Sequence, residues 1–402
     1  MVDPSINERE PRLDRLQLFV LAGLMFIGAA FIYSATLANP TEAAKAWFAQ
    51  SWFHQIIWYS IGAGAAAALC VVDYHSLARW SFVAYGVTIF WLLAVLIPHV
   101  GTVHYGARRW INLGLFQFQP GEFAKLSFIL AMANFLSRPP EELKLPENFW
   151  KSIGLMMLPF ILIFKEPDLG SALVLLPTGL AMMLVAGTPK RFLLKLGACV
   201  GIFGVLCLVD VLFAPHKFQI PIQDYQRQRL LVYFGASFAD KNATPEQKAE
   251  ARLSQLESSY QGRQALISVG SGGLLGKGWG KGDQIALGFL PQKEAPNDFI
   301  FSVIAEEEGF AGSLVVLTLY AVVLFTGLRI AGQARDRLGK LVAVGVVTLI
   351  FSHVFINIGM NIRIVPVTGI PLPLLSYGGS SVLCSLIALG LMQNVHIHRR
   401  GY

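Results

Sequence analysis

Long apolar runs are the feature that most restricts what this chain can fold into. The first, from Leu16 to Thr41, contains no charged side chain. Further apolar runs occupy residues 52–72, 80–100, 193–213, 299–330, 341–362 and 372–395. About twenty apolar residues are enough for a helix to cross a bilayer. Because backbone polar groups must pair internally in hydrocarbon, these runs predict several membrane-spanning helices.

The composition agrees with that prediction. The chain is 54% hydrophobic and 14% charged, with a mean hydropathy of +0.54, whereas roughly a quarter of the residues in a soluble domain are charged. Three less regular segments, 118–136, 152–164 and 169–185, bring the expected number of spans to about ten. We therefore predict an all-α, polytopic integral membrane protein. The net charge of +7 fits basic loops beside the spans better than a nucleic-acid partner.

A mostly polar segment, residues 214–297, interrupts the pattern between the seventh and eighth spans. We interpret residues 1–402 as a single membrane domain and 214–297 as a large extracytoplasmic loop within it. Lysine and arginine concentrate on one side of the predicted spans, which indicates the cytoplasmic side. That side carries Arg9, Arg12, Arg15, Arg79, Arg138, Lys144, Lys151, Lys190, Arg191, Lys195, Arg329, Arg335, Arg337, Lys340, Arg399 and Arg400. Both termini are therefore expected in the cytoplasm, and the large loop outside.

A few charges fall on the opposite side, where the topology rule does not require them. The basic residues of its short loops are Lys45, Arg108, Arg109, Lys165 and Arg363. Glu122 and Lys125 lie three residues apart on one helical face, and Lys165 stands close to Asp168. Each pair could be a structural salt bridge. Together, the clusters also suit a cavity under the outer leaflet that binds a phosphate-bearing lipid.

Asp298 stands where the polar loop turns into an apolar run, with Glu306, Glu307 and Glu308 a few turns further on. Carboxylates at a membrane surface are costly and often functional. Asp298 is a candidate general base, and Glu306 a candidate substrate-binding residue. The alternative for Asp298 is a helix N-cap. The preceding stretch 270–282, GSGGLLGKGWGKG, has glycines that suit tight turns and close approach to a ligand.

The segment from Pro366 to Ser381, PVTGIPLPLLSYGGSS, contains three prolines and three glycines that would break a helix. It is predicted either as a re-entrant turn fitted against its neighbours or as a segment that contacts substrate. In the second case, Ser376, Ser380 and Ser381 would offer hydroxyl groups. His353, Asn357 and Asn361 share one helical face, where hydrogen bonding between helices is the favoured interpretation.

This last segment resembles the signature of the SEDS family (shape, elongation, division and sporulation), also known as the RodA/FtsW family. The blocks GARRWINLG, FQPGEFAK, KEPDLG, YQRQRLL and GGLLGKGWGKG are similar to other blocks of that family and occur in matching order. The resemblance covers essentially the whole chain, and KEPDLG and YQRQRLL lean toward the elongation branch over the division branch.

The resemblance implies a peptidoglycan glycosyltransferase that polymerises lipid II and works with a class B penicillin-binding protein. This would place the protein in the bacterial cytoplasmic (inner) membrane, in cell elongation and cell-shape maintenance. The family's catalytic aspartate corresponds to Asp298. Its other site residues correspond to Arg109, Glu122, Lys125 and Asp168. The sequence departs from the family pattern at KEAPN before Asp298, at Glu308 and at Arg363.

The predicted chemistry transfers a lipid-linked glycan to a sugar hydroxyl of lipid II, with a polyprenyl pyrophosphate as leaving group. Such a reaction needs a base near the hydroxyl and positive charge near the pyrophosphate. Arg108, Arg109, Lys125 and Lys165 are candidates for that positive charge, alone or with a divalent cation such as Mg²⁺ or Mn²⁺. A lipid II flippase, a division-specific polymerase and a scaffold for a transpeptidase are the alternatives.

Overall fold

The computed structural model describes residues 13–399 except 99, 105–106, 113, 115–116, 214–223, 236–237 and 239–244. Ten long helices follow the ten predicted runs. They are α1 (Arg15–Leu37), α3 (Ser51–Val71), α5 (Ser81–Leu96), α6 (Pro120–Leu136), α8 (Pro146–Lys165), α9 (Leu169–Ala186), α10 (Lys190–Phe213), α14 (Ile300–Gln333), α15 (Arg337–Asn361) and α16 (Gly379–His398). The prediction of a polytopic helical membrane protein is confirmed.

Among the described residues, eight of these helices are long and apolar enough to cross a membrane, namely α1, α3, α8, α9, α10, α14, α15 and α16. The other two are shorter: α5 has 16 residues, and α6 has 17 with Glu122 and Lys125 among them. Two predicted boundaries were wrong. The span expected at 152–164 extends over Pro146–Lys165, and the span expected at 372–395 begins only at Gly379 because the proline-rich segment before it is not helical.

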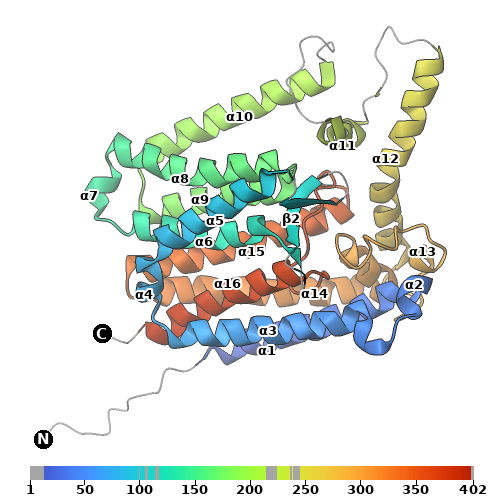
Figure 1. Cartoon of the computed structure of the whole chain (residues 1–402), viewed down its shortest axis with the longest axis horizontal. Helices are drawn as coiled ribbons and strands as arrows, with labels where there is room; N and C mark the ends of the chain where they lie inside the picture. Colours follow the sequence, from blue (N-terminus) through green and yellow to red (C-terminus); the bar gives the residue numbers. More distant parts are fainter. Residues whose placement is uncertain are drawn as a thin grey trace, which may run out of the picture.

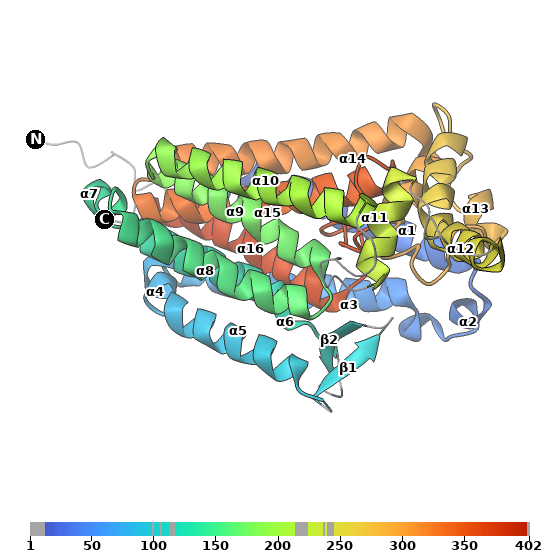
Figure 2. The ribbon, with the colours of Figure 1, turned by 90° about the horizontal axis from the view of Figure 1, so that it is seen from above.

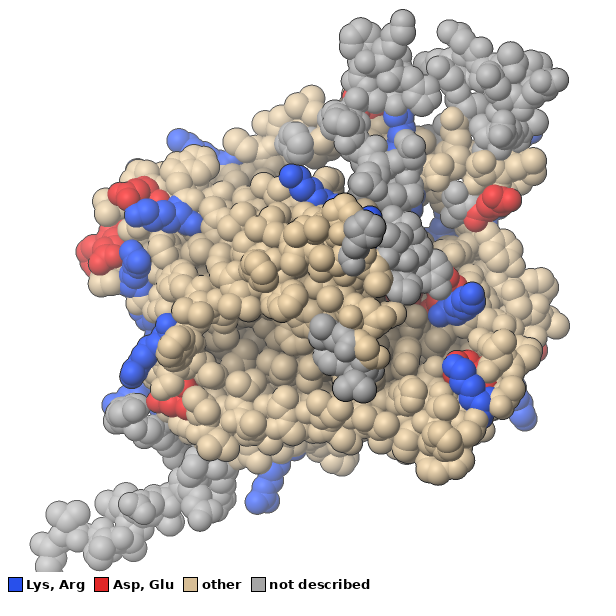
Figure 3. All heavy atoms as spheres, viewed as in Figure 1, with Lys and Arg blue, Asp and Glu red and all other residues tan. Residues whose placement is uncertain are grey.

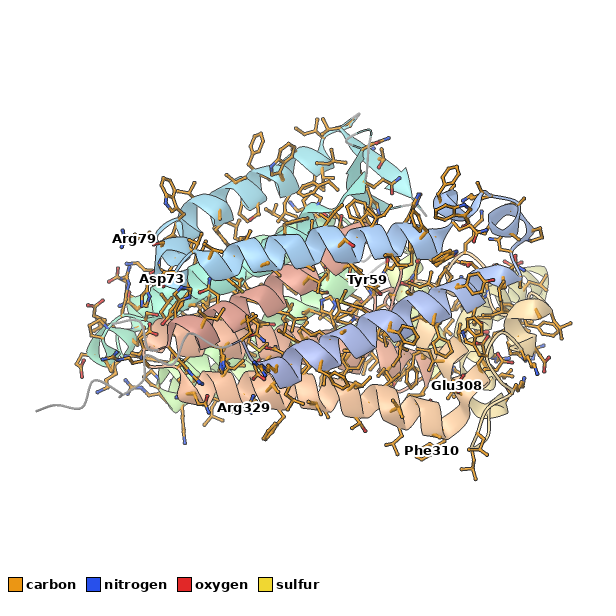
Figure 4. All side chains as sticks on the ribbon, turned by 90° about the horizontal axis from the view of Figure 1, so that it is seen from below. Tyr59, Asp73, Arg79, Glu308, Phe310 and Arg329 are labelled. Carbon is orange, nitrogen blue, oxygen red and sulfur yellow. The ribbon has the colours of Figure 1, made fainter. Side chains whose placement is uncertain are left out.

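The helices form an elongated bundle (Figure 1). The first and last helices of the chain meet at one end of the molecule. There the Asp14 N–H donates to Gln393 Oε1 at 3.0 Å, and Arg329 forms an ion pair with Asp14. We call this the terminal end. The opposite end, where α12 (Pro245–Ser271) crosses the direction of the bundle helices, is the loop end. Figure 4 shows Arg329, Asp73 and Arg79 toward the terminal end and Glu308 and Phe310 at the loop end.

Helix α15 lies inside the bundle: it contacts α6, α9, α14 and α16 and is buried along most of its length. A Cβ on Gly345 would lie 2.7 Å from Ile129 of α6 and 3.0 Å from Met182 of α9. Small residues of this kind let membrane helices approach closely. In contrast, α10 turns apolar side chains such as Leu194 and Ile202 outward. The face drawn in Figure 3 carries most of its charges at the two ends, with a largely uncharged band between them.

A small antiparallel sheet at the loop end was not predicted. Its strands are β1 (Gly101–His104), β2 (Ala107–Asn112) and β3 (Gln117–Phe118), in the order β1-β2-β3. The sheet packs against α5 and α6 and lies next to the end of α5 in Figure 2. It places Arg108 and Arg109 on one short strand. Strands of two to six residues give too weak a periodic signal to be recognised between two apolar helices.

Residues 362–378 connect α15 and α16 without helical structure. Side chains of neighbouring helices donate hydrogen bonds to carbonyl groups of this segment. Tyr59 of α3 donates to Leu374 O, Tyr320 of α14 donates to Pro373 O, and Asn357 of α15 donates to Ile370 O at 2.7 Å. Irregular backbone at this depth needs such partners because no lipid can supply them.

The large segment between α10 and α14 contains helices of its own, although parts of it lie outside the described residues. These helices are α11 (Asp224–Phe234), α12 and α13 (Asp283–Ala286). Four short helices occupy other connections: α2 (Pro40–Ala43), η1 (Trp47–Ala49), α4 (Tyr74–Arg79) and α7 (Pro140–Leu143). α12 packs on α14 and α15, and α11 packs on α12 and α10. The loop thus folds back over the end of the bundle.

Candidate active site

Asp298 lies at the junction between the large loop and α14, and hydrogen bonds fix its backbone. Its N–H donates to Glu294 O at 2.9 Å, and its carbonyl oxygen accepts from Asn357 Nδ2 and Asn361 Nδ2, both at 3.1 Å. Asn361 Oδ1 in turn accepts from the hydroxyl of Ser302. Asn361 therefore links α15 to α14 as predicted, whereas Asn357 donates to non-helical backbone, and both amides position the aspartate.

The carboxylate of Asp298 does not cap α14. The N-cap position is Phe299, and this helix has no side-chain cap hydrogen bond. Within the part of the chain that the structure describes, no hydrogen bond to the Asp298 carboxylate is found, and the residue is half-buried. Gly369 passes close by: its φ is +76°, and a Cβ there would lie 3.3 Å from Asp298 Oδ2. The geometry favours a chemical role for this side chain over the capping alternative.

The pKa of Asp298 is raised to about 6, and burial is the largest cause. Glu294 and Asp168 contribute to the rise, whereas the guanidinium groups of Arg229 and Arg109 oppose it. A carboxylate with such a pKa is still ionised at neutral pH and is a stronger base than an ordinary aspartate. These charges come from four separate elements, so the bundle and the loop both set the basicity of one group.

Arg109 and Asp168 face each other beside this junction. Arg109 Nη1 lies 3.8 Å from Asp168 Oδ1, and Arg109 Nη2 donates to Pro167 O. Asp168 caps α9 by accepting from Ser171 N at 3.1 Å, and it accepts from Gln119 Nε2 at 3.2 Å. The Nε of Arg109 is buried without a hydrogen-bond partner among the described residues. Arg109 is thus held in place with donor capacity left for a ligand.

Glu166, which the sequence analysis did not select as a site residue, lies two positions before Asp168. It is 1% exposed, and its Oε1 has no hydrogen-bond partner in the described part of the chain. Burial, together with the charge of Asp168, raises the pKa of Glu166 to about 9, although the charge of Arg109 opposes the rise. Glu166 is therefore protonated at neutral pH, and its carboxyl can donate a hydrogen bond.

Glu122 and Lys125 form a separate, fully buried group. Lys125 Nζ lies 2.6 Å from Glu122 Oε1 and 3.0 Å from His353 Nε2, and the two charged residues are 3% and 1% exposed. The cavity beside them measures about 10 Å³, which is no larger than a site for one water molecule. The structure favours the structural salt bridge over the pyrophosphate contact for this pair.

The carboxylates of Glu306 and Glu307 fasten the glycine-rich stretch 270–282 to the start of α14. Glu306 is 0% exposed and accepts from Ser268 Oγ at 2.8 Å, Lys277 Nζ at 2.6 Å and Gln284 N at 3.1 Å. Glu307 accepts from Ser34 Oγ and from Gly280 N at 3.1 Å. A Cβ at Gly272 would lie 1.9 Å from Ala305 O. Gly272 therefore allows close contact with α14, and the acceptor oxygens of Glu306 are occupied by protein donors.

The remaining predicted residues are placed as follows. Ser376 Oγ donates to Asn297 O and accepts from Leu372 N at 2.8 Å; Ser380 Oγ donates to Gln117 O at 3.0 Å and accepts from Gln119 N at 3.3 Å. Both hydroxyls are occupied by backbone groups. Arg108 Nη1 donates to Leu96 O at 3.4 Å, and its Nε is buried without a partner among the described residues. Lys165 ends α8 and is exposed.

The structure thus brings Asp298, Arg109 and Asp168 together and keeps Glu122, Lys125 and Glu306 apart from them. It adds Arg229 and Glu166. Arg229 belongs to the block YQRQRLL and Glu166 to KEPDLG, so sequence blocks already noted contained both residues. No group of three His, Cys, Asp or Glu side chains suited to holding a metal ion is present in the described residues.

Comparisons with known proteins cover nearly the whole chain. Residues 14–401 match the family FTSW_RODA_SPOVE, described as cell cycle protein. The chain is 36% identical over 311 residues to peptidoglycan glycosyltransferase MrdB of Escherichia coli (strain K12), covering 77% of this chain and 76% of that protein. It is 32% identical over 390 residues to peptidoglycan glycosyltransferase RodA of Treponema pallidum, covering 85% and 88%.

Solved structures show the same similarity in three dimensions. A chain from a study of "structural coordination of polymerization and crosslinking by a peptidoglycan synthase complex" superposes with a TM-score of 0.74 and 28% identity, covering 97% of this chain and 99% of that one. The crystal structure of the Thermus thermophilus rod shape determining protein RodA gives a TM-score of 0.65 and 27% identity, covering 96% and 98%.

The buried pair makes a prediction about stability. Lys125→Ala leaves Glu122 buried without its cation, so it should lower the free energy of unfolding by about 3–5 kcal/mol. The measurement is thermal stability and yield of the purified protein in detergent. Lys151→Ala is the matched control, because it breaks an exposed lysine–glutamate pair with Glu147 and should change stability little.

The double variant Glu122→Gln, Lys125→Met removes both charges and should recover much of the lost stability. If Lys125→Ala is as stable as Lys151→Ala but inactive, the salt-bridge interpretation is wrong and Lys125 contacts substrate.

Proposed function

The chain belongs to the FtsW, RodA and SpoVE family of cell cycle proteins, and from this premise we propose that Asp298 is the general base of its glycosyl transfer. The protein is a peptidoglycan glycosyltransferase, as relatives from Escherichia coli and Treponema pallidum are. A role in cell elongation agrees with its similarity to proteins named MrdB and RodA. The proposed substrates are lipid II and a growing lipid-linked glycan.

One observation carries the assignment of the base. The Asp298 carboxylate stands at a loop-to-helix junction, has no hydrogen bond within the described residues, and has a pKa of about 6. Its backbone is held by Asn357 and Asn361. A positioned, unengaged carboxylate with a pKa near the working pH is what a general base requires.

The reaction follows from this arrangement. The sugar hydroxyl of the acceptor gives its proton to the Asp298 carboxylate, and the hydroxyl oxygen forms a bond to the anomeric carbon of the lipid-linked donor. The bond between that carbon and the diphosphate oxygen breaks, and the polyprenyl diphosphate leaves with the electron pair. Arg109 and Arg229, whose charges both act on Asp298, would stabilise the negative charge on the leaving diphosphate.

A divalent cation is not assigned a place in this scheme. The described carboxylates near Asp298 do not converge into a three-ligand cluster, and Asp168 is already occupied by Arg109, Gln119 and Ser171. We therefore propose that any Mg²⁺ or Mn²⁺ would be held mainly by diphosphate oxygens, and no step here depends on it.

The proposed partner is a class B penicillin-binding protein. A structural relative comes from a peptidoglycan synthase complex that coordinates polymerization and crosslinking, and a polymerase of this family would pass its product to such a crosslinking enzyme. We also propose that the multi-pass protein lies in the bacterial cytoplasmic membrane, with the terminal end in the cytoplasm and the loop end, with Asp298, outside.

Asp298→Asn tests the base directly. The amide cannot accept the proton, so lipid II polymerisation by the purified protein should fall on the order of 10²–10⁴-fold. Lipid II binding and thermal stability should stay close to those of the unsubstituted protein, because the carboxylate makes no hydrogen bond that the described structure depends on. Asp283→Asn, which alters an exposed aspartate of the same loop, is the control. Near-normal polymerisation by Asp298→Asn would exclude Asp298 as the base.

The charges around Asp298 predict a pH dependence. Polymerisation should rise with pH through about 6 as Asp298 loses its proton. Arg229→Gln removes a cation that lowers the pKa, so the inflection should move to higher pH; Glu294→Gln removes an anion that raises it, so the inflection should move to lower pH. The measurement is kcat/KM for lipid II from about pH 4.5 to about pH 8.5, a range that extends to both sides of the pKa of about 6. If the inflection pH shifts in the same direction in both variants, or in neither, then these charges do not set the pKa of Asp298 as described.

Orientation can be tested by fusion reporters. A reporter inserted between Ser254 and Gly262 in α12 should be scored outside the cytoplasm, and one fused after Arg400 inside. The opposite result would place Asp298 on the cytoplasmic side and exclude polymerisation on the outer face.

A further inference from the structure

The loop end contains a cavity of about 440 Å³ that the proposed chemistry does not use. It lies between α11, α12 and the segment that follows α15. Its volume falls within the roughly 300–1,000 Å³ of typical small-molecule sites. Three arginines line it: Arg252 and Arg263 from α12, and Arg363 just after α15.

The lining has the character of an anion site. No aspartate or glutamate lines the cavity among the described residues. In the same described set, Arg252, Arg263 and Arg363 form no ion pair or side-chain hydrogen bond, so no described carboxylate pairs with these three guanidinium groups. Guanidinium groups bind phosphate oxygens through two parallel hydrogen bonds, which suits them to phosphate recognition.

The cavity also has an apolar side. Val232 and Phe234 of α11 and Leu256 of α12 contribute to its lining next to the arginines. Tyr233 joins the two parts, since its hydroxyl donates to Ile364 O at 2.7 Å and ties α11 to the segment after α15. A ligand that fits this lining combines an anionic group with an apolar chain.

Arg363 is held in an unusual backbone conformation. Its φ is +58°, a left-handed conformation that costs a residue with a side chain on the order of 1–3 kcal/mol. Its N–H donates to Met360 O at 3.3 Å as α15 ends. This turn brings Arg363, which does not belong to α12, into the lining of the cavity. A strained backbone conformation of this kind persists only where surrounding contacts fix it, and such positions cluster at ligand sites.

A smaller space lies next to this cavity and shares part of its lining. It measures about 30 Å³ and shares Val232, Tyr233, Ser259 and Arg363 with the large cavity. Its lining also includes Arg229, the residue whose charge acts most strongly among the cations on Asp298. Arg229 therefore relates the two sites: it lines the smaller space next to the cavity, and its charge acts on Asp298.

We propose that the three-arginine cavity binds the diphosphate of the lipid-linked acceptor. The ligand's identity rests on the proposed function, in which both substrates carry a diphosphate. The leaving diphosphate of the donor is attached to the reacting carbon and belongs beside Asp298. The acceptor's diphosphate is separated from its reacting hydroxyl by sugar rings, so its site has to be displaced from the base. The three-arginine cavity meets this requirement, since Asp298 is not part of its lining. Much of that lining comes from α12, which lies at the loop end of the bundle (Figures 1 and 2).

The test measures binding and not turnover. The full-length protein is placed in nanodiscs of phosphatidylcholine, and the affinity of a fluorescent polyprenyl diphosphate is measured. Arg252→Gln, Arg263→Gln and Arg363→Gln should each weaken binding on the order of tenfold, because each removes a charge-assisted contact to phosphate. Lys281→Gln, which removes a charge from the same loop outside the cavity, should leave the affinity unchanged. Affinities unchanged in all three arginine variants would overturn the proposal.

Two further arms identify the ligand. Adding phosphatidylglycerol to the nanodiscs should displace the probe weakly; displacement as effective as that by unlabelled polyprenyl diphosphate would make the cavity a headgroup site and overturn the substrate assignment. In polymerisation assays, the arginine variants should raise KM for lipid II while kcat changes less. An equal fall in kcat with unchanged KM would contradict an acceptor site.

The binding arm separates the two proposals. If Asp298→Asn polymerises normally but the arginine variants lose binding, the base is wrong and the cavity stands. If Asp298→Asn is inactive and the arginine variants bind normally, the base stands and the cavity assignment fails.

Discussion

Residues 362–378 have to satisfy their backbone polar groups inside a helical bundle without forming a helix, and much of the structure depends on how they do so. Tyr59, Tyr320 and Asn357, from three different helices, donate to carbonyls of this segment. Gln55 of α3 adds a fourth hydrogen bond, to Ser376 O at 3.0 Å. Each unpaired group would cost several kcal/mol in hydrocarbon, by an order-of-magnitude estimate. The helices are therefore fixed against one another through this segment.

The same segment supports Asp298. Ser376 donates to Asn297 O, the Tyr377 N–H donates to Pro296 O at 2.9 Å, and Gly369 lies against the carboxylate. Asn357 contacts both sides, since its amide donates to Ile370 O and to Asp298 O. The loop that carries the base is thus docked on the irregular segment and on α15. Burial that results from this docking is the largest cause of the raised pKa of Asp298.

The sequence predicted the helices well because long apolar runs report burial in lipid directly. It also located Asp298, Arg109 and Asp168 through short blocks of charge. It could not separate Lys125 from Arg109 as pyrophosphate ligands, because that difference depends on burial: Lys125 is enclosed with Glu122 and His353, whereas Arg109 is partly exposed. Glu306 was likewise indistinguishable from a site residue until Ser268, Lys277 and Gln284 were seen to occupy it. Arg229 and Arg363 come together only through the tertiary fold, and no spacing along the chain reveals that.

Because charges of both signs surround Asp298, we expect its pKa to change when an anionic substrate binds. Arg229 and Arg109 hold the pKa of Asp298 below the value that burial, Glu294 and Asp168 alone would produce. A diphosphate that pairs with either arginine neutralises part of this effect, so the pKa of Asp298 rises when an anionic substrate is bound. A higher pKa makes the carboxylate a stronger base toward the sugar hydroxyl, provided that it is still ionised. On the proposed function, Asp298 is therefore readily ionised in the free protein and becomes more basic once both lipid-linked substrates are in place.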